Sequence, residues 1–401
     1  MAVIWIINQY ALQPAERTTA RHNFFANRLS ELGHDVTIIC AREHHLQTKS
    51  PSSFIPNDHG FKIRIFNTFR YAHARDKRRV LAWFVFAWRL LSLKKTAEQN
   101  PDIILISSPS LISFLGAESL AKHFGARLVL EIRDLWPLSL IDLGQHSAKH
   151  PFIKFLAWLE ARAIGRSDHV VTTMEGGTEY VSTIGDGQTP CTWIPNALSK
   201  KTIEKFRLEA IKVRAEDERF VVGYTGTLGF TNSVVTIVQA ASLLRQDTTI
   251  KFVILGKGPQ EVGLKQSVTD NELSNVEFLP HGTEDVVIAT LRKVDATLIC
   301  WRDRSIYNFG TSAMKVPTYL AIGKPIIQAY SGKYDRIKMN DAGITVPAEN
   351  ARALADAVMQ MKNKTTYERN RLGENGHALA HNIYSLEIQF PKLLKAFGLV
   401  K

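Results

Sequence analysis

The stretch RFVVGYTGTLG (219–229) begins a second copy of a pattern that already runs through the first half of the chain. Its β-branched residues predict a strand, and the glycines after them predict a tight turn where that strand ends. The first copy opens with VIWIIN (3–8) and continues through DIILISS (102–108) and RLVLEIRD (127–134), with helical patterns between these runs. Strands that alternate with helices in this way predict a doubly wound parallel sheet.

The restart of the pattern predicts two Rossmann-like α/β domains, each with its own parallel sheet. We place them at residues 1–197 and 198–378, followed by an amphipathic helix over 379–401 that can cross back to the N-terminal domain. A chain of 401 residues has the length of two domains. Open α/β sheets bind ligands beyond the carboxyl ends of their strands. Two such domains that face a central cleft should therefore carry functional residues in the loops after strands.

The composition favours a soluble protein of a reducing compartment. Hydrophobic residues make up 45% and charged residues 22% of the chain, as in ordinary globular proteins. The cysteines Cys40, Cys191 and Cys300 fit neither a disulfide framework nor a paired metal motif. The N-terminal MAVIWIINQY lacks the basic region of a signal peptide, and no apolar run approaches the roughly 20 residues that span a bilayer. We therefore expect a cytoplasmic location.

A net charge of +12 favours an anionic partner, and one segment concentrates the charge. Between Arg70 and Lys95, basic residues flank the apolar run VLAWFVFAW (80–88), and Asp76 is the one acidic residue. This composition predicts a helix that binds peripherally to the anionic inner face of the cell membrane. A core helix with a solvated basic flank is the open alternative, and nucleic acid is disfavoured because the aromatic residues form one apolar block. The predicted membrane contacts are Arg75, Lys77, Arg78, Arg79, Trp83, Phe84 and Trp88.

Two glycine turns of the second half predict loops that approach an anionic ligand. GYTGTLG (223–229) and GKGP (256–259) each end an apolar run, so each should lie at the carboxyl end of a strand. Glycine lets the backbone come close to a ligand, and the helix that follows presents its positive N-terminus. Neither turn is a G-x-G-x-x-G motif, which argues against a dinucleotide. Tight turns without a ligand are the simpler alternative.

A third loop lies in NFGTSAMKVPTYLAIGKPII (308–327), where polar residues lead into an apolar helix. Proline is tolerated only in the first turn of a helix, so Pro317 places the helix start near Met314. Lys315 adds a positive charge to that helix start, and two arginines lie in the preceding loop. These cationic features together predict a diphosphate site, and a capped surface helix with solvated arginines is the alternative.

In the first half, the strand in LEIRDLWP (130–137) ends with Arg133 and Asp134, which we take as candidate catalytic residues. A charged pair at the end of a strand is well placed to meet a reacting group, and a structural ion pair is the alternative. The chain holds no D-x-D, no P-loop, no His/Cys zinc spacing and no G-x-S-x-G motif. We therefore expect no metal ion and no cofactor.

Taken in order, these stretches resemble the GT-B glycosyltransferases of family 4, which are retaining enzymes that use nucleotide sugars. Within that family they are similar to bacterial O-antigen and capsule transferases of the N-acetyl-fucosamine type. The resemblance spans nearly the whole chain. It is carried by TARHNFFANRLSELGHDVTIIC (19–40), DIILISSPSL (102–111), EIRDLWPLSL (131–140), IPNAL (194–198), GYTGTLG (223–229), VILGKGP (253–259) and KVPTYLAIGKPII (315–327).

The resemblance implies a GT-B fold with a donor site in the second half. It places the donor diphosphate on the loop of Gly226 and on the helix start at Lys315, and the nucleobase near Lys257 and His281. A polar loop of the first half approaches the donor. The donor-binding residues that we predict are Thr18, Thr19, Thr225, Gly226, Thr227, Gly256, Lys257, Pro280, His281, Arg302, Arg304, Thr311, Ser312, Lys315 and Thr318.

Several positions depart from the family pattern. An Arg and a Lys that often follow the glycine loop fall on Thr227 and Asn232, and two glutamates often found eight positions apart fall on Gly310 and Thr318. The catalytic-loop His of many members falls on Arg133. In a retaining transfer the leaving diphosphate can itself take the acceptor's proton, so cationic stabilisation matters more than a carboxylate. Thr318 could then replace part of a ribose contact.

The resemblance implies a metal-independent transfer of a sugar, an N-acetylated hexosamine or deoxyhexosamine, from a UDP-sugar. The implied acceptor is a polyprenyl-diphosphate-linked or other lipid-linked saccharide of bacterial surface polysaccharide synthesis, such as O-antigen in lipopolysaccharide or capsule. Because both glutamates are absent, a non-catalytic nucleotide-sugar-binding subunit is one alternative. A GT-B nucleotide-sugar epimerase is another, although it would need acid/base carboxylates and no membrane-binding segment.

Overall fold

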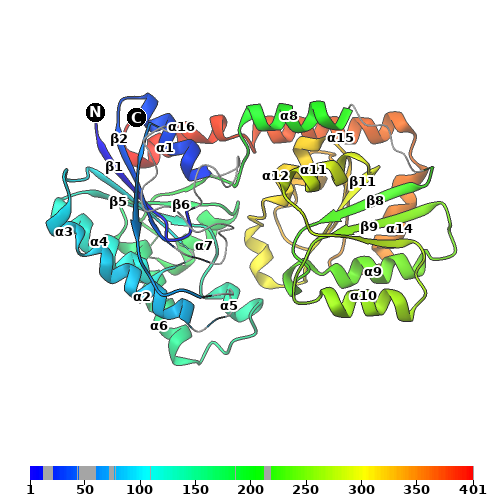
Figure 1. Ribbon diagram of the computed structural model, residues 1–401, viewed down its shortest axis with the longest axis horizontal. Coiled ribbons are helices and arrows are strands. Elements are labelled where there is room, and N and C mark those ends of the chain that lie inside the picture. Colours follow the sequence, from blue (N-terminus) through cyan, green and yellow to red (C-terminus); the bar gives the residue numbers. More distant parts are fainter. Residues whose placement is uncertain are drawn as a thin grey trace. The chain divides into compact units, whose positions relative to one another are not determined.

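The computed structural model describes the chain except for residues 12–20, 43, 45–59, 72–75, 77, 109, 186, 212–217 and 401. The chain forms two compact units (Figure 1). Unit 1 comprises Met1–Pro195 together with Gln389–Lys401, and unit 2 comprises Asn196–Ile388. The C-terminal end of the chain therefore belongs to unit 1.

The region 379–401, expected as one helix, is divided between two helices. Helix α15 (Thr366–Asn382) ends inside this region, and α16 (Leu386–Phe397) begins after a break. In the break, Leu198 donates its N–H to the carbonyl of Tyr384 at 3.0 Å and accepts from the N–H of Leu386 at 2.8 Å. Because these backbone groups pair across an isolated β-bridge, they are not available for helical hydrogen bonds.

Unit 1 is built on a parallel sheet of seven strands in the order β3-β2-β1-β4-β5-β6-β7. In the middle of β1, Trp5 aligns with Thr37 on one side and Ile104 on the other. Every residue of β4 is buried, as expected for a parallel strand covered on both faces. The strands are β1 (Val3–Ile7), β2 (Asp35–Ala41), β3 (Lys62–Phe66), β4 (Ile103–Ser107), β5 (Arg127–Ile132), β6 (His169–Thr172) and β7 (Cys191–Trp193).

Helices cover the unit 1 sheet, and close contacts join two pairs of them. A Cβ on Gly116 of α4 would lie 2.6 Å from the carbonyl oxygen of Ala87, so α2 can approach this closely only because the residue is glycine. Phe390 of α16 stacks on Phe25 of α1 at 6.3 Å between ring centroids, which attaches the C-terminal segment to unit 1. The helices are α1 (Arg21–Glu31), α2 (Arg78–Leu90), α3 (Leu93–Thr96), α4 (Ile112–Phe124), α5 (Leu138–Asp142), α6 (Pro151–Arg166), α7 (Gly177–Ile184) and α16.

Unit 2 holds a parallel sheet of six strands in the order β10-β9-β8-β11-β12-β13. Its core includes the fully buried Tyr224, Leu298 and Ile327. The strands are β8 (Phe220–Thr225), β9 (Ile250–Leu255), β10 (Val276–Leu279), β11 (Ala296–Cys300), β12 (Ile326–Ala329) and β13 (Gly343–Val346). The prediction of two doubly wound parallel sheets is thus confirmed, because the apolar runs that predicted the strands are the buried strands of the structure.

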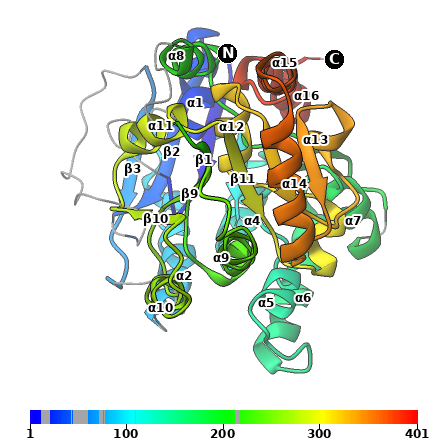
Figure 2. The ribbon, with the colours of Figure 1, turned by 90° about the vertical axis from the view of Figure 1, so that its right-hand side faces the viewer.

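The helices of unit 2 lie on both faces of its sheet, with α8, α12 and α15 above it and α9 and α10 below it in both views (Figures 1 and 2). The neighbours β8 and β11 are not consecutive in sequence, and the chain leaves them toward opposite faces. Ligands of open α/β sheets bind at such a switch point. The helices are α8 (Lys200–Ile211), η1 (Phe230–Asn232), α9 (Val234–Leu243), α10 (Glu261–Asp270), α11 (Glu284–Arg292), η2 (Ser305–Phe309), α12 (Lys315–Ile322), α13 (Arg336–Met339), α14 (Ala351–Asn363) and α15.

Candidate functional site

Lys315, the first residue of α12, lies at this switch point of unit 2. Its Nζ donates to the hydroxyl of Tyr224 at 3.1 Å and to Oδ1 of Asn232 at 2.6 Å. The ammonium also lies 4.6 Å from the ring centroid of Tyr224 and 5.8 Å from that of Trp301. Among the described residues no acidic side chain pairs with it, and burial lowers the pKa of Lys315 to about 7. A desolvated cation with neutral partners gains stability when an anion binds beside it.

Two glycine turns bring their backbone against each other beside Lys315. Gly226 has φ of +148°, and a Cβ on it would lie 3.2 Å from Nζ of Lys315. A Cβ on Gly256 would lie 1.8 Å from the carbonyl oxygen of Gly226, so neither turn accepts a side chain there. The N–H of Gly226 donates to Leu255 at 2.9 Å, which joins the ends of β8 and β9.

Tyr319 fixes α12 to the end of β8. Its side chain is fully buried, its hydroxyl accepts from the N–H of Thr225 at 2.7 Å, and it donates to the carbonyl of Thr225 at 3.0 Å. The predicted donor residues Thr225, Gly226 and Lys315 therefore lie together at one edge of the sheet. Tyr319 was not predicted, and its only sequence signal is its place one helical turn after Lys315.

Glu349 supplies the carboxylate that the stretch 308–327 lacks. It accepts from Nη1 of Arg302 at 2.6 Å and from the N–H of Asp303 at 2.8 Å, and it lies 3.7 Å from Arg304. Arg302 also stacks on Phe230, with 4.0 Å from its Cζ to the ring centroid. The two arginines predicted to bind a diphosphate are thus already paired with Glu349. Lys315, by contrast, has no carboxylate partner among the described residues.

Arg302 and Arg304 line a small cavity of unit 2. Its volume is about 270 Å³, and Tyr307, Asn308 and Ser331 are among its other lining residues. Sequence reasoning missed Glu349 because it follows β13, 47 residues after Arg302. The φ of +59° at Glu349 shows that the structure holds this residue in an unusual backbone conformation.

The remaining predicted donor residues lie around this edge. Met314 is the N-cap of α12 and has no side-chain cap, so the helix begins where Pro317 predicted. Thr311 and Ser312 lie in the loop before it, and the carbonyl of Ser312 accepts from Nδ2 of Asn196 at 2.5 Å. The hydroxyl of Thr318 donates to the carbonyl of Met314 at 3.0 Å, so a ligand could only donate to it. The other predicted residues are Thr227, Lys257, Pro280 and His281, which are exposed in loops after β8, β9 and β10, and Gly256, which is buried.

In unit 1, Asp134 follows β5 at the carboxyl edge of the sheet. Its carboxylate accepts from the indole N–H of Trp136 at 3.0 Å and from Ser139, and it forms no ion pair with Arg133 among the described residues. Burial raises the pKa of Asp134, although these hydrogen bonds and the charge of Arg79 oppose the shift. The backbone N–H of Arg133 donates to Oγ of Ser108 at 2.9 Å.

A buried carboxylate that sequence reasoning missed lies two residues before Arg133. Glu131 pairs with Arg21 at 3.0 Å, accepts from Nε2 of His22 at 2.7 Å and accepts from Oγ of Ser107 at 2.5 Å. Burial alone would raise the pKa of Glu131, but Arg21 and His22 hold it well below the usual range. The sequence signal was an acidic residue inside an apolar strand, and its role is to connect β4, β5 and the start of α1.

Helix α2, which was predicted to bind a membrane, has one face buried in unit 1 and one exposed face. Trp83 is only 4% exposed, and its indole N–H donates to the hydroxyl of Tyr10 at 2.5 Å. Arg79 lies over the rings of Tyr10, Trp83 and Trp136. The expectation that Trp83 contacts a membrane is therefore wrong, because its side chain is buried in unit 1. Arg79 is half-buried, so its membrane contact stays a prediction. Phe84 and Trp88 are 46% and 69% exposed, and Arg78 is also exposed.

Four predicted residues, Thr18, Thr19, Arg75 and Lys77, lie outside the described residues. Among the helices that the structure describes, none combines the length and the apolar character needed to cross a bilayer.

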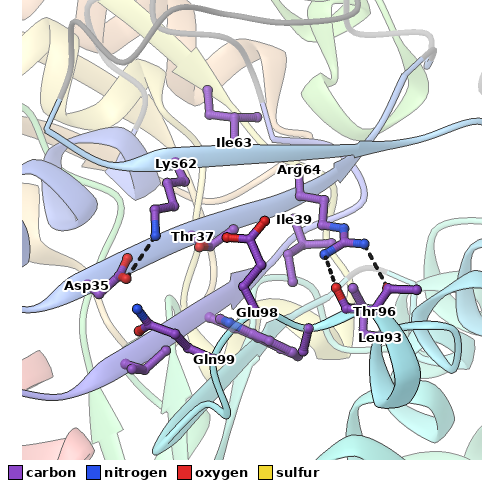
Figure 3. A pocket seen from close by; sticks show the side chains of 13 residues that line it. Asp35, Thr37, Ile39, Lys62, Ile63, Arg64, Leu93, Thr96, Glu98 and Gln99 are labelled. Atoms are coloured by element: carbon purple, nitrogen blue, oxygen red, sulfur yellow. Dashed lines mark hydrogen bonds and ion pairs between the residues drawn. The ribbon is translucent and has the colours of Figure 1, made fainter.

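A cavity of unit 1, of about 400 Å³, lies at the amino ends of β1, β2 and β3 (Figure 3). Three of its charged groups have partners: Lys62 pairs with Asp35 at 2.9 Å, and Arg64 donates to the side chain of Thr96 at 2.8 Å. Figure 3 shows Glu98 among these side chains. Parallel sheets bind ligands at the opposite ends of their strands, so this cavity is not the candidate site.

Comparison with known proteins agrees with the geometry of both units. Residues 20–197 match the family described as Glycosyl transferase 4-like domain, and residues 206–378 match Glycosyl transferases group 1. Each unit thus matches a family of glycosyltransferase domains, and the two parallel sheets are those of the GT-B fold.

Three similar proteins extend this result. The chain is 26% identical over 210 residues to WcaI of Escherichia coli K12, a candidate colanic acid biosynthesis glycosyl transferase, and spans about half the length of that relative (50% of this chain, 51% of WcaI). Its fold is similar to HepE of Anabaena in complex with UDP and glucose, with a TM-score of 0.69, 12% identity and 100% of both chains covered. It is also similar to sucrose-phosphate synthase of Thermosynechococcus elongatus, with a TM-score of 0.74, 15% identity, and 100% of this chain and 99% of the other covered.

Proposed function

We propose that the chain transfers a sugar from a UDP-sugar to a lipid-linked saccharide during synthesis of a bacterial surface polysaccharide. The observation that carries the proposal is Lys315, a half-buried lysine with neutral partners beside two glycine turns. A diphosphate offers the charge and the acceptor oxygens that such a site lacks. HepE, whose fold is similar, was solved with UDP and glucose, which supports this nucleotide.

The acceptor part of the proposal is supported by similarity to WcaI, which is a candidate enzyme of colanic acid biosynthesis. Polyprenyl-diphosphate-linked saccharides are the acceptor class that we propose. The donor sugar, an N-acetylated hexosamine or deoxyhexosamine, rests on the resemblance to O-antigen and capsule transferases.

The proposed reaction is retaining and needs no metal ion. Negative charge develops on the diphosphate as the bond to the anomeric carbon breaks, and Lys315 together with the N-terminus of α12 stabilises that charge. The leaving diphosphate oxygen takes the proton of the acceptor hydroxyl. Asp134 is the group that we propose to orient that hydroxyl, because its carboxylate is fixed by Trp136 at the edge of the unit 1 sheet.

Peripheral binding to the inner face of the cell membrane is the proposed location. It is supported by an exposed apolar stripe on and just after α2, which consists of Leu81, Phe84, Trp88 and Leu91 and is called the α2 stripe below. These residues recur at helical spacing, so they share one face. An apolar face next to basic residues suits an anionic lipid surface.

Calorimetry with UDP tests the donor site. Lys315→Ala should weaken UDP binding by roughly 1.5–3 kcal/mol, the contribution of a hydrogen bond to a charged group. Lys265→Ala removes an exposed lysine of α10 and should leave UDP affinity unchanged. Equal affinity of the wild-type protein and Lys315→Ala would remove Lys315 from the site.

A non-catalytic nucleotide-sugar-binding subunit is the second candidate, favoured by Gly310 and Thr318 at the positions where family members often carry glutamates. Both candidates bind UDP, so turnover separates them. Release of UDP that requires a lipid-linked saccharide supports the transferase, whereas tight binding without turnover supports the subunit.

A further inference from the structure

Two histidines and a glutamate of unit 2 converge away from the candidate functional site. His377 and His381 lie one turn apart on α15, so they project from the same face of that helix. Oε1 of Glu204, on α8, lies 2.7 Å from Nε2 of His381 and 4.0 Å from Nε2 of His377. The ligand atoms of the three side chains all lie within 4.8 Å of one another.

A hydrogen bond orients His377 as a metal ligand is usually oriented. Its Nδ1 lies 3.1 Å from the carbonyl oxygen of Ala321 in α12. Because a carbonyl can only accept, Nδ1 carries the proton, and Nε2 directs its lone pair toward Glu204 and His381. Metal-bound histidines characteristically donate their other ring nitrogen to a carbonyl or carboxylate in this way.

The spacing fits a tetrahedral ion after small side-chain movements. Bonds of about 2.0–2.1 Å from zinc to nitrogen or oxygen place ligand atoms about 3.3 Å apart, between the two distances that Glu204 makes. Glu204 is 55% exposed on its side chain, so it can move and an ion can enter from solvent. A water molecule can complete the coordination, as in sites with three protein ligands.

The positive charge of Arg207 acts against a cation at His377, but Glu374 pairs with that charge. Arg207, one turn after Glu204 on α8, pairs with Glu374 and donates to the carbonyls of Ile322 and Gly323. A simple ion pair would explain Glu204 and His381, but it gives no reason for His377 to point its unprotonated nitrogen at the same carboxylate. The two rings meet edge to face with their centroids 4.8 Å apart, and each brings its Nε2 toward Oε1 of Glu204.

We propose that Glu204, His377 and His381 bind one divalent transition-metal ion of the zinc class. Two imidazole nitrogens and a carboxylate oxygen are a donor set that suits zinc. The ion joins α8 to α15, and through His377 it also supports the last turn of α12. Lys315 lies at the other end of α12, so the ion stabilises unit 2 and takes no part in sugar transfer.

Titration of tag-free, chelator-treated protein with ZnCl₂ tests the proposal, with calorimetry and thermal unfolding as readouts. We expect one zinc ion per chain and a higher Tm for the zinc-loaded protein. Glu204→Gln and His381→Ala should each weaken zinc binding by about tenfold or more and remove most of the Tm increase. His146→Ala, which removes an exposed histidine of unit 1, should change neither readout.

Cobalt distinguishes the proposed site from scattered surface binding, because tetrahedral Co²⁺ absorbs visible light far more strongly than octahedral Co²⁺. Wild-type protein with Co²⁺ should show that absorption, and Glu204→Gln should lose it. The proposal is overturned if zinc affinity is the same in all variants, or if Glu204→Gln lowers the Tm equally with and without zinc. UDP affinity should be the same with and without zinc, so a failure of this proposal leaves the donor site untouched.

Discussion

Lys315 is the residue on which the donor site depends most. Its partners are the neutral side chains of Tyr224 and Asn232, and burial lowers its pKa to about 7. The arginines that were predicted to share its role are paired with Glu349. A ligand that brings a negative charge to Lys315 should therefore also raise its pKa.

The protonation of Lys315 should give the protein two pH dependences of opposite sign. In the unfolded chain a lysine has a pKa of about 10.4, so between pH 7 and 10 the unfolded state binds more protons and stability without ligand should rise with pH. UDP binds the charged form better, so its affinity should fall by about tenfold or more between pH 7 and 9. Calorimetry and chemical unfolding across this range measure both effects.

Lys315→Met is the control for these two effects, because it keeps the shape of the side chain but cannot titrate. Both slopes should flatten in this variant. If the wild-type protein shows the same UDP affinity at pH 7 and pH 9, the ammonium of Lys315 does not contact the diphosphate.

Asp134 is the second residue whose role can be separated by experiment. If its carboxylate orients the acceptor hydroxyl, Asp134→Asn should keep UDP affinity and lower kcat by roughly 10²–10⁴. If it only holds Trp136 and Ser139, the same change should mainly lower the Tm. Measuring kcat and Tm on one preparation decides, and a stable variant with wild-type kcat would exclude Asp134 from the reaction.

At the scale of elements, α2 packs into unit 1 with one face and exposes apolar side chains on the other. Its inner face places Trp83 and Arg79 beside Tyr10 and Trp136, next to the loop of Asp134. Its outer face carries the α2 stripe. The spacing of apolar residues in α2 is consistent with both faces. The aromatic composition alone could not show that Trp83 is buried and Trp88 exposed.

The α2 stripe should drive binding to anionic vesicles. Replacing Phe84 and Trp88 by Ser should weaken binding by about 2 kcal/mol or more, since each aromatic side chain loses apolar area that the lipid would cover. The Tm should change little because both side chains are exposed. Vesicle sedimentation measures the partition.

Tyr367→Ser is the matched control for vesicle binding, because it removes an exposed aromatic side chain from unit 2. It should bind vesicles like the wild-type protein. Unchanged binding of the Phe84 and Trp88 variant would leave the α2 stripe without a role in membrane attachment.

At the scale of the whole molecule, one experiment with EDTA tests both whether sugar transfer needs a metal ion and whether a bound ion stabilises unit 2. Sugar transfer should continue after EDTA treatment, because Lys315 and the N-terminus of α12 supply the positive charge. The same treatment should lower the Tm through loss of the ion at Glu204, His377 and His381. Assays well below the Tm keep the two effects apart, and a strict need for Mg²⁺ or Mn²⁺ in turnover would contradict the proposed mechanism.

The sequence by itself determined the two doubly wound sheets and most of the strand ends where the candidate residues lie. Buried parallel strands require continuous apolar runs, and the glycine turns and Pro317 fix where loops end and helices begin. These signals are local, so they survive in a single sequence. The position of Lys315 at a helix start could be predicted because Pro317, two residues later, is a local signal of that start.

Only the tertiary structure decided which charges are paired and which aromatic side chains are buried. Glu349 meets Arg302 because the loops after β11 and β13 leave the same edge of one sheet. Glu131 meets Arg21 and His22 across a longer distance in sequence, 109 residues from His22. Such partners lie on different elements, and no local pattern records them. Electrostatic energy depends on distance in space and on burial, and both are set only when the chain has folded.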